Sequence, residues 1–286
     1  MKIAICYSGG VNAQPWTFNN HLLALLTKDV QLDVFAHFWK MTAPQWLPNN
    51  ILDLEPIIKS SNKGRALNLE NVTIKKIVSE KSKSKIFEQQ VIENYIPPNR
   101  AGELVGPLDG AGGWPYRALS MFYGIGEAIN LALQEEKSGK FKYDFIFRLR
   151  PDLVFIDTHV PRDLNKCDST KLNVAPFYWE KREGGTYVKG RRWNEYRGKE
   201  KSIEDGTEYC TAEGVDDTIG WGNGEVMSKY AGVYKNYSST INSGQKIFSQ
   251  ECLLGTHLEN EGVEVFKTDW ACSLVSNDPR QRILFK

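Results

Sequence analysis

Two arginines and an aspartate interrupt an apolar segment near the middle of the sequence. In DFIFRLRPDLVF, residues 144–155, Arg148 and Arg150 stand on alternate positions of a strand-like run, and Asp152 follows directly after Pro151. Because alternate residues of a strand share a face, both guanidinium groups are expected on the same side. A guanidinium fork donates paired hydrogen bonds to phosphate, so the pattern favours a diphosphate site. A structural Arg–Asp network that closes a sheet is the alternative.

A second group of candidate residues lies in the acidic segment EGVDDTIGWGNGEVM, residues 213–227. A carboxylate in such a segment could take the proton from a hydroxyl group during a transfer reaction. Asp217 is the first candidate for this base and Asp216 is the second. A turn or helix-capping network is the alternative, since Asp and Asn favour such positions.

Small residues and one further arginine complete the candidate anion site. Ser8, Gly9 and Gly10 end the first apolar run, where small side chains let the backbone approach a phosphate group. Arg117 stands near the start of an expected helix, a position that favours contact with a diphosphate or a sugar. A tight turn and an exposed capping turn are the respective alternatives.

Aromatic residues supply a candidate surface for a sugar ring. Residues 180–201 mix lysine and arginine with Tyr187, Trp193 and Tyr196, which favours an acceptor-side loop, although a solvated loop is the simpler interpretation. We expect Trp193, Trp221 and Glu251 to contact an acceptor.

The elements that must position these residues follow a β-α-β order. Residues 2–10 are expected to form a buried strand with a glycine turn, residues 15–29 a helix and residues 30–39 a second strand, which is how a doubly wound parallel sheet begins. Further strands are expected at 71–78, 142–150, 171–179, 216–223 and 263–269, and helices at 84–95, 116–136, 224–237 and 249–262. Residues 180–208 are expected to be an exposed excursion.

Composition excludes several classes of protein. The net charge of +1 and 41% hydrophobic residues are typical of a globular protein with no general attraction to nucleic acid or anionic membranes. The order of the expected elements favours a single α/β domain over residues 1–286, with an irregular C-terminal half. No apolar run approaches the roughly 20 residues of a membrane span. Five widely spaced cysteines without a CxxC motif favour a reducing, cytoplasmic compartment. The oligomeric state is left open.

Taken in order, the motifs resemble those of the GT-A glycosyltransferases, in particular a bacterial and viral group with an RxRPDLxF strand. In that family, a strand with an apolar-x-D-x-D-apolar pattern ends at the diphosphate of the nucleotide sugar. Asp152 falls on the second aspartate of this pattern, whereas Arg150 replaces the first. The resembling segments are residues 2–9, 33–39, 116–120, 143–155 and 216–227, together with Glu251.

This resemblance implies a GT-A-like fold with a Rossmann-type, mostly parallel sheet, a nucleotide-sugar half at 1–155 and an acceptor half at 156–286. It implies transfer of a sugar from a nucleoside diphosphate sugar to a hydroxyl of a glycan. Arg148 and Arg150 would offset the charge of the leaving diphosphate, and Asp217 would be the base of an inverting reaction. Asp152 would hold the ribose, the sugar or a divalent cation, Mn²⁺ or Mg²⁺. A non-catalytic protein that binds sugar nucleotides or glycans is the alternative, because the first aspartate is missing.

Overall fold

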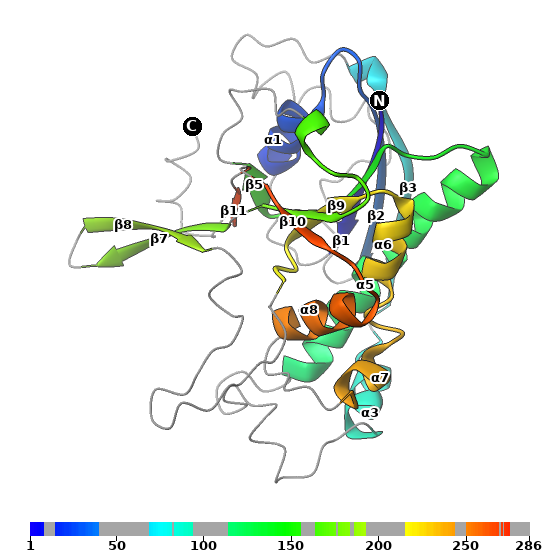
Figure 1. Ribbon diagram of the computed structural model, residues 1–286, viewed down its shortest axis with the longest axis vertical. Helices are drawn as coiled ribbons and strands as arrows, with labels where there is room; N and C mark the ends of the chain where they lie inside the picture. Colours follow the sequence, from blue (N-terminus) through cyan, green and yellow to red (C-terminus); the bar gives the residue numbers. More distant parts are fainter. Residues whose placement is uncertain are drawn as a thin grey trace.

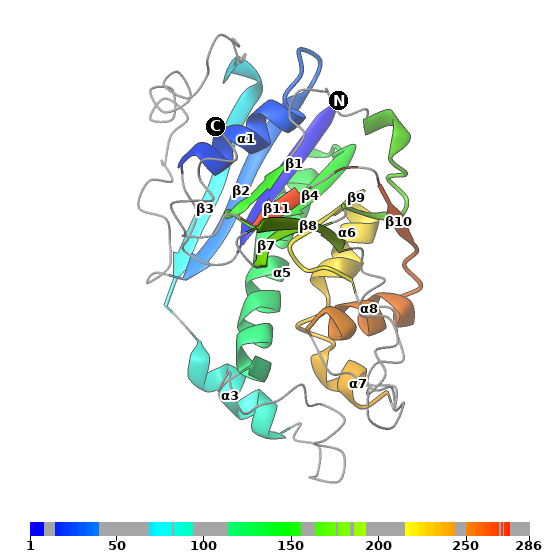
Figure 2. The same cartoon turned by 90° about the vertical axis from the view of Figure 1, so that its left-hand side faces the viewer.

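A seven-stranded, mostly parallel sheet forms the centre of the computed structural model, and helices cover both of its faces, as Figure 1 and Figure 2 show. The strand order is β10-β6-β9-β4-β1-β2-β3. The α/β architecture expected from the sequence is therefore confirmed. The structure describes residues 1–8, 15–39, 69–81, 83–93, 114–155, 164–175, 177–183, 186–192, 215–243, 250–268, 270 and 272–274.

The first half of the sheet follows the predicted β-α-β order. Strand β1 (Lys2–Ser8) lies parallel to β2 (Gln31–Trp39), and helix α1 (Pro15–Leu25) connects to β2 from one face. A short 3₁₀ helix, η2 (Leu69–Asn71), leads into β3 (Val72–Glu80), which extends the parallel sheet beside β2. Strand β1 is buried from Ile3 to Ser8, which explains its continuous apolar sequence.

Two helices precede the central strand β4 (Phe145–Leu149). Helix α3 (Ser84–Glu93) is followed by the 26-residue helix α5 (Trp114–Gly139). The helix expected at 116–136 is confirmed, and one of its faces packs on the sheet: Leu119, Phe122, Ile125 and Ile129 are buried, Leu133 is partly buried, and α5 contacts β1, β2 and β4.

The later part of the chain completes the same sheet. Strands β6 (Leu172–Val174) and β9 (Ile219–Gly222) follow the 3₁₀ helix η3 (Leu164–Lys166), and β10 (Val265–Lys267) lies beside β6. Strand β9 is antiparallel to both β4 and β6. Helices α6 (Gly224–Ala231), α7 (Tyr237–Ile241) and α8 (Gln250–Asn260) follow β9. The division into two functional halves remains a prediction.

A second, four-stranded sheet has the order β5-β11-β7-β8. Strands β5 (Leu153–Phe155) and β11 (Cys272–Leu274) are antiparallel, and β7 (Phe177–Glu183) forms a hairpin with β8 (Thr186–Arg192). The hairpin projects from the body of the molecule in Figure 1. The expected excursion at 180–208 therefore begins with regular strands, and its part after residue 192 lies outside the described residues.

Alternation along β4 divides the interior into two layers. Phe145, Phe147 and Leu149 face the layer that contains the apolar residues of α1, whereas Ile146 belongs to the layer packed against α5 and α6. Arg148 has the same parity as Ile146 and lies on the α5 side. An arginine is thus placed where the strand pattern requires a core residue.

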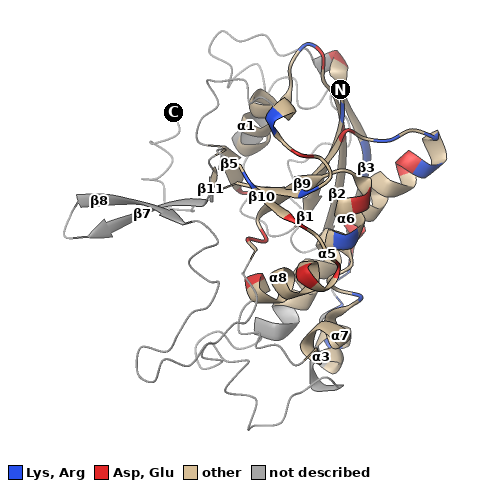
Figure 3. Ribbon diagram, viewed as in Figure 1, with Lys and Arg blue, Asp and Glu red and all other residues tan. Residues whose placement is uncertain are grey.

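The distribution of charged residues and the state of the cysteines do not indicate a particular binding partner. Figure 3 shows basic and acidic residues on several of the described elements, and no described helix has the length and apolarity to cross a membrane. Cys6, Cys167 and Cys272 are not disulfide-bonded, whereas Cys252 on α8 is. A disulfide is uncommon in a reducing compartment. The cytoplasmic location remains a prediction.

Candidate functional site

The candidate site lies where the strand order of the central sheet reverses. From β1 the chain first builds β2 and β3 on one side, and it then places β4 on the other side of β1. Ligands of open α/β sheets bind at such a switch point, outside the carboxyl ends of the strands. Here β1 ends at Ser8 and β4 at Leu149, and Ile219 at the start of antiparallel β9 lies opposite Leu149. The Asp216–Asp217 segment therefore reaches the same edge as Arg150.

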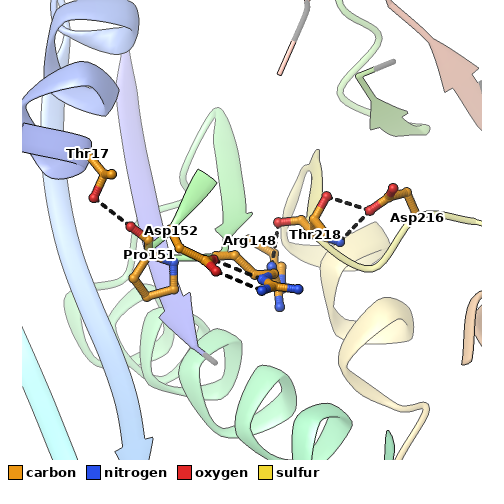
Figure 4. Close-up of polar contacts among 7 residues, drawn as sticks. Thr17, Arg148, Pro151, Asp152, Asp216 and Thr218 are labelled. Carbon is orange, nitrogen blue, oxygen red and sulfur yellow. Dashed lines mark hydrogen bonds and ion pairs between the residues drawn. The ribbon is translucent and has the colours of Figure 1, made fainter. Parts of the chain in front are cut away.

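Arg150 and Asp152 form a paired ionic contact immediately after β4. The Arg150 Nε and Nη2 atoms donate to Oδ1 and Oδ2 of Asp152 at 3.0 and 2.8 Å, as Figure 4 shows. The side chain of Arg150 is 27% exposed, whereas that of Asp152 is 6% exposed. Burial lowers the pKa of Arg150, but the Asp152 hydrogen bonds and charge outweigh this effect and raise it. Arg150 therefore presents a partly accessible cation to this edge of the sheet.

Arg148 occupies a different environment from the one that the sequence predicted. Its guanidinium is completely buried, and Nη1 donates to the carbonyl oxygen of Thr218 (Figure 4). The Nε and Nη2 atoms have no hydrogen-bond partner among the described residues. Burial lowers the pKa of Arg148. Of the two arginines expected to face a diphosphate, only Arg150 has accessible surface, and Arg148 is a core residue beneath the β4–β9 ladder.

The two aspartates before β9 have separate environments. The Oδ1 atom of Asp216 accepts hydrogen bonds from the backbone nitrogen of Thr218, at 2.7 Å, and from the Thr218 hydroxyl. This is the turn network considered as the alternative for Asp216. Asp217 is 2% exposed, and burial raises the pKa of its carboxyl to about 6. The charges of Asp216 and Glu251 act in the same direction, whereas those of Arg148 and Arg150 oppose the increase.

Helix α1 fixes the backbone that carries the Arg150–Asp152 pair. The Thr17 hydroxyl donates to the Pro151 carbonyl at 2.6 Å (Figure 4). One turn later, Asn20 donates to the Phe155 carbonyl at 3.0 Å and accepts from the Phe155 nitrogen at 2.7 Å. These contacts anchor both ends of the segment 151–155.

His21 supplies the central contact between α1 and this segment. Its Nε2 atom lies 2.8 Å from the Leu153 carbonyl oxygen, and its Nδ1 atom lies 2.8 Å from the Tyr7 hydroxyl. A carbonyl only accepts, so Nε2 carries the hydrogen and Nδ1 accepts from Tyr7. Burial lowers the pKa of His21 to about 4, although the Leu153 carbonyl and Asp152 act to raise it. His21 is therefore neutral at physiological pH.

The structure describes the surroundings of some of the other predicted site residues but not of all. Ser8 is buried at the end of β1, and its hydroxyl has no partner among the described residues. Glu251 lies in the first turn of α8, where its carbonyl oxygen accepts from the Val215 nitrogen at 3.0 Å. Arg117 lies in the first turn of α5, and its side chain is outside the described part of the structure. Gly9 and Gly10 lie outside the described residues.

The predicted acceptor contacts of the two tryptophans receive no support. Trp221 is completely buried on the α1 side of the sheet, with its ring stacked against Phe147 and Trp270 at centroid distances of 5.1 and 4.8 Å. It has no surface to offer a sugar in this structure. Trp193 lies outside the described residues.

The described residues do not fit a divalent cation. Both oxygens of Asp152 accept from Arg150, and no group of three His, Cys, Asp or Glu side chains suited to a metal gathers within the described ranges. Mg²⁺ and Mn²⁺ favour carboxylate oxygens that are free to coordinate. Metal binding at Asp152 stays a prediction that this arrangement of donors does not favour.

Sequence reasoning did not single out Tyr230 or the polar residues of α1. Thr17, Asn20 and His21 recur at i, i+3 and i+4 in α1, and that spacing places them on one helix face. This spacing is a signal that a neighbouring backbone segment requires hydrogen-bond partners. Tyr230 lies among apolar residues on α6, and its sequence context gives no comparable signal.

The fold and the strand-end residues define an α/β protein with a polar site at a topological switch point. No family model and no curated protein matches the sequence. Among solved structures, the chain is similar to the apo form of mouse xyloside xylosyltransferase 1, with a TM-score of 0.38 and 10% identity. The match covers 94% of this chain and 84% of that chain.

Proposed function

We propose that the protein is a glycosyltransferase that moves a sugar from a nucleoside diphosphate sugar to a hydroxyl of a glycan. The observation that carries this proposal is the position of Arg150 and Asp152 at the carboxyl end of β4, beside the end of β1, where an open α/β sheet binds its ligand. The resemblance of the RxRPDLVF segment to the GT-A strand motif supports the same function.

Arg150 is the residue that binds the diphosphate of the donor. Its guanidinium is charged at all physiological pH values and can exchange the Asp152 carboxylate for two phosphate oxygens. Charge accumulates on the diphosphate as its bond to the sugar breaks, and a fixed cation stabilises this charge more in the transition state than in the ground state. Asp152, once released, is placed to accept hydrogen bonds from a ribose or sugar hydroxyl.

Asp217 is the general base if the reaction inverts configuration. Its carboxylate takes the proton of the acceptor hydroxyl while the acceptor oxygen bonds to the anomeric carbon, and the bond from that carbon to the diphosphate breaks. A pKa of about 6 leaves most of this carboxyl ionised at neutral pH and close to the optimum for proton transfer. Because Asp217 is 2% exposed, acceptor binding must displace part of its surroundings.

A binding protein without turnover is the second candidate, and two observations favour it. The Nε and Nη2 donors of Arg150 are both bonded to Asp152, and Asp217 is only 2% exposed. Such a site would hold a sugar nucleotide or a glycan after a local rearrangement but would lack a base in contact with the acceptor.

Release of free nucleoside diphosphate separates the two candidates. A thermal-shift panel of nucleotide sugars, with and without Mn²⁺, first identifies the donor that the protein binds. That donor is then incubated with the protein and a panel of saccharide acceptors. A transferase releases nucleoside diphosphate in an acceptor-dependent manner, and in an inverting transferase Asp217→Asn abolishes this release. The control is Asp168→Asn, in the turn before β6 where the Asp168 carboxylate accepts from the Thr170 nitrogen at 2.9 Å, and this variant keeps the release. Tight donor binding without release under any of these conditions would establish the binding protein instead.

A further inference from the structure

Three neighbouring side chains on the α5 side of the sheet carry buried polar atoms without partners. These atoms are Nε and Nη2 of Arg148, Oδ2 of Asp217 and the hydroxyl of Tyr230, and none has a hydrogen-bond partner in the described part of the chain. Folded proteins satisfy nearly all buried polar groups with protein atoms or ordered water. Four such atoms on three adjacent residues therefore require an explanation.

The β4–β9 ladder shows why the three residues come together. Arg148 lies directly opposite Gly220, three residues after Asp217. A Cβ atom at Gly220 would lie 3.3 Å from Cε2 and 3.8 Å from Cζ of Tyr230, so the tyrosine ring rests against the glycine. The hydroxyl-bearing end of Tyr230 is thereby placed beside Arg148. The glycine is needed here for space rather than for its backbone conformation.

The charges of these groups act on one another. The Arg148 charge influences both Tyr230 and Asp217, and Asp217 influences Tyr230 in turn. Asp216 from the segment before β9, Glu251 from α8 and Arg150 after β4 are the other charged groups that face Asp217. No direct hydrogen bond joins Arg148, Asp217 and Tyr230, although their donors and acceptors are complementary.

We propose that Arg148, Asp217 and Tyr230 form an internal hydration site, in which one water molecule bridges the guanidinium, the carboxylate and the phenol hydroxyl. Water suits this site because it accepts from Arg148 while it donates to Asp217 and bonds to Tyr230. An internal water typically makes about three hydrogen bonds to polar groups that would otherwise be unpaired. All three side chains are buried in the free protein, and water is the smallest molecule that can both accept from Arg148 and donate to Asp217.

The site assigns Arg148 and Tyr230 a positioning function. A hydrogen bond from the water to the carboxylate stabilises the ionised form of Asp217 and offsets part of the burial that raises its pKa. Tyr230 orients the water, and its own pKa is raised by burial, so that its hydroxyl stays protonated. That Asp217 is a catalytic base rests on the function proposed above, whereas the hydration site itself does not.

The test compares Tyr230→Phe with Tyr234→Phe in the full chain. Tyr230→Phe removes only the hydroxyl and keeps the ring on Gly220, whereas the Tyr234 hydroxyl donates to Gln90 on α3 and serves as a matched control. Carboxyl carbon NMR of aspartate-labelled protein follows the titration of Asp217, assigned by the Asp217→Asn spectrum. In Tyr230→Phe the water loses its third partner and leaves the site, so Asp217 loses the hydrogen bond that the water donates, and we expect its pKa to rise by about one unit. In Tyr234→Phe we expect the Asp217 pKa to stay unchanged.

A high-resolution crystal structure of the wild-type protein provides the second readout. Electron density for a water within hydrogen-bonding distance of all three side chains supports the site, and a direct Arg148–Asp217 bond without water overturns it. An unchanged Asp217 pKa in Tyr230→Phe also overturns it. In an active enzyme, Tyr230→Phe additionally moves the acid limb of the rate profile to higher pH. If no sugar transfer is found, the NMR and crystallographic results still decide the hydration site.

Discussion

Arg150 is held by both carboxylate oxygens of Asp152, only two residues further along the chain. The paired geometry is the one that a guanidinium also adopts with phosphate. Asp152 therefore occupies the positions that a donor diphosphate would take, and donor binding is an exchange of one anion for another. Removal of the Asp152 charge should therefore strengthen the binding of the diphosphate.

Asp152→Asn is expected to strengthen the binding of nucleoside diphosphates by about tenfold, because a neutral amide competes less well for Arg150 and no longer repels the ligand. Isothermal titration calorimetry without metal measures the change. Asp144→Asn, at the opposite end of β4, is the control for the altered net charge. The amide oxygen of the variant can still accept from a ribose hydroxyl, so weaker binding in Asp152→Asn would contradict the exchange of anions at Arg150.

Thr17→Val tests the anchoring of the strand end by α1. Loss of the hydroxyl leaves the Pro151 carbonyl without this donor and lowers the free energy of unfolding by about 1–2 kcal/mol. Because Pro151 lies between Arg150 and Asp152, we also expect weaker binding of nucleoside diphosphate. Thr17→Ser keeps the hydroxyl and restores both properties. Equal donor affinity in the Val and Ser variants contradicts a positioning function for α1.

His21 makes stability depend on pH in the acid range. Its folded pKa of about 4 lies below the ordinary value of 6.5, so the unfolded chain binds more protons between these values. The stability that neutral His21 provides is present above pH 6.5 and decreases as the pH falls toward 4, by up to about 3 kcal/mol. Urea unfolding between pH 4 and 7 measures this slope. His21→Gln is expected to flatten it, and an identical slope in the variant would exclude His21 as the cause.

Asp217 makes the stability of the protein depend on pH in the opposite direction from His21. Its pKa is raised from 3.8 to about 6 on folding, so its contribution is fully favourable below pH 3.8 and is lost as the pH rises through 6. Asp217→Asn cannot ionise and is expected to be more stable than the wild type at pH 8, by up to about 3 kcal/mol. The stability difference should shrink as the pH decreases below 6. A variant that is less stable at pH 8 contradicts the raised pKa.

The sequence predicts the sheet well where hydrophobic patterns reflect burial. The apolar runs of β1 and β4 and the apolar residues of α5 are apolar because they pack in the core. The two strands and the helix were correctly predicted from these patterns. The short strands β5 and β11 were not predicted as a pair, because their pairing depends on residues more than a hundred positions apart.

The chemistry of the site was less predictable than its location. The RxRPD pattern correctly indicates a polar strand end, but it does not show that Arg148 is sealed by β9 while Arg150 reaches the surface. This difference arises because Thr218, which lies 70 positions from Arg148, covers its guanidinium. Burial of Trp221 likewise follows from its stacking against Trp270, which no local pattern reveals.

Calorimetric titration of a nucleoside diphosphate into the wild-type protein and Arg150→Ala tests the central claim most directly. The diphosphate is that of the donor selected by thermal shift, and Lys142→Ala, an exposed cation at the opposite edge of the sheet, is the control. We predict that the wild type and Lys142→Ala bind the ligand equally and that Arg150→Ala binds at least about tenfold more weakly, with its fold retained. Equal affinity of Arg150→Ala and the wild type would contradict the assignment of Arg150 to the diphosphate.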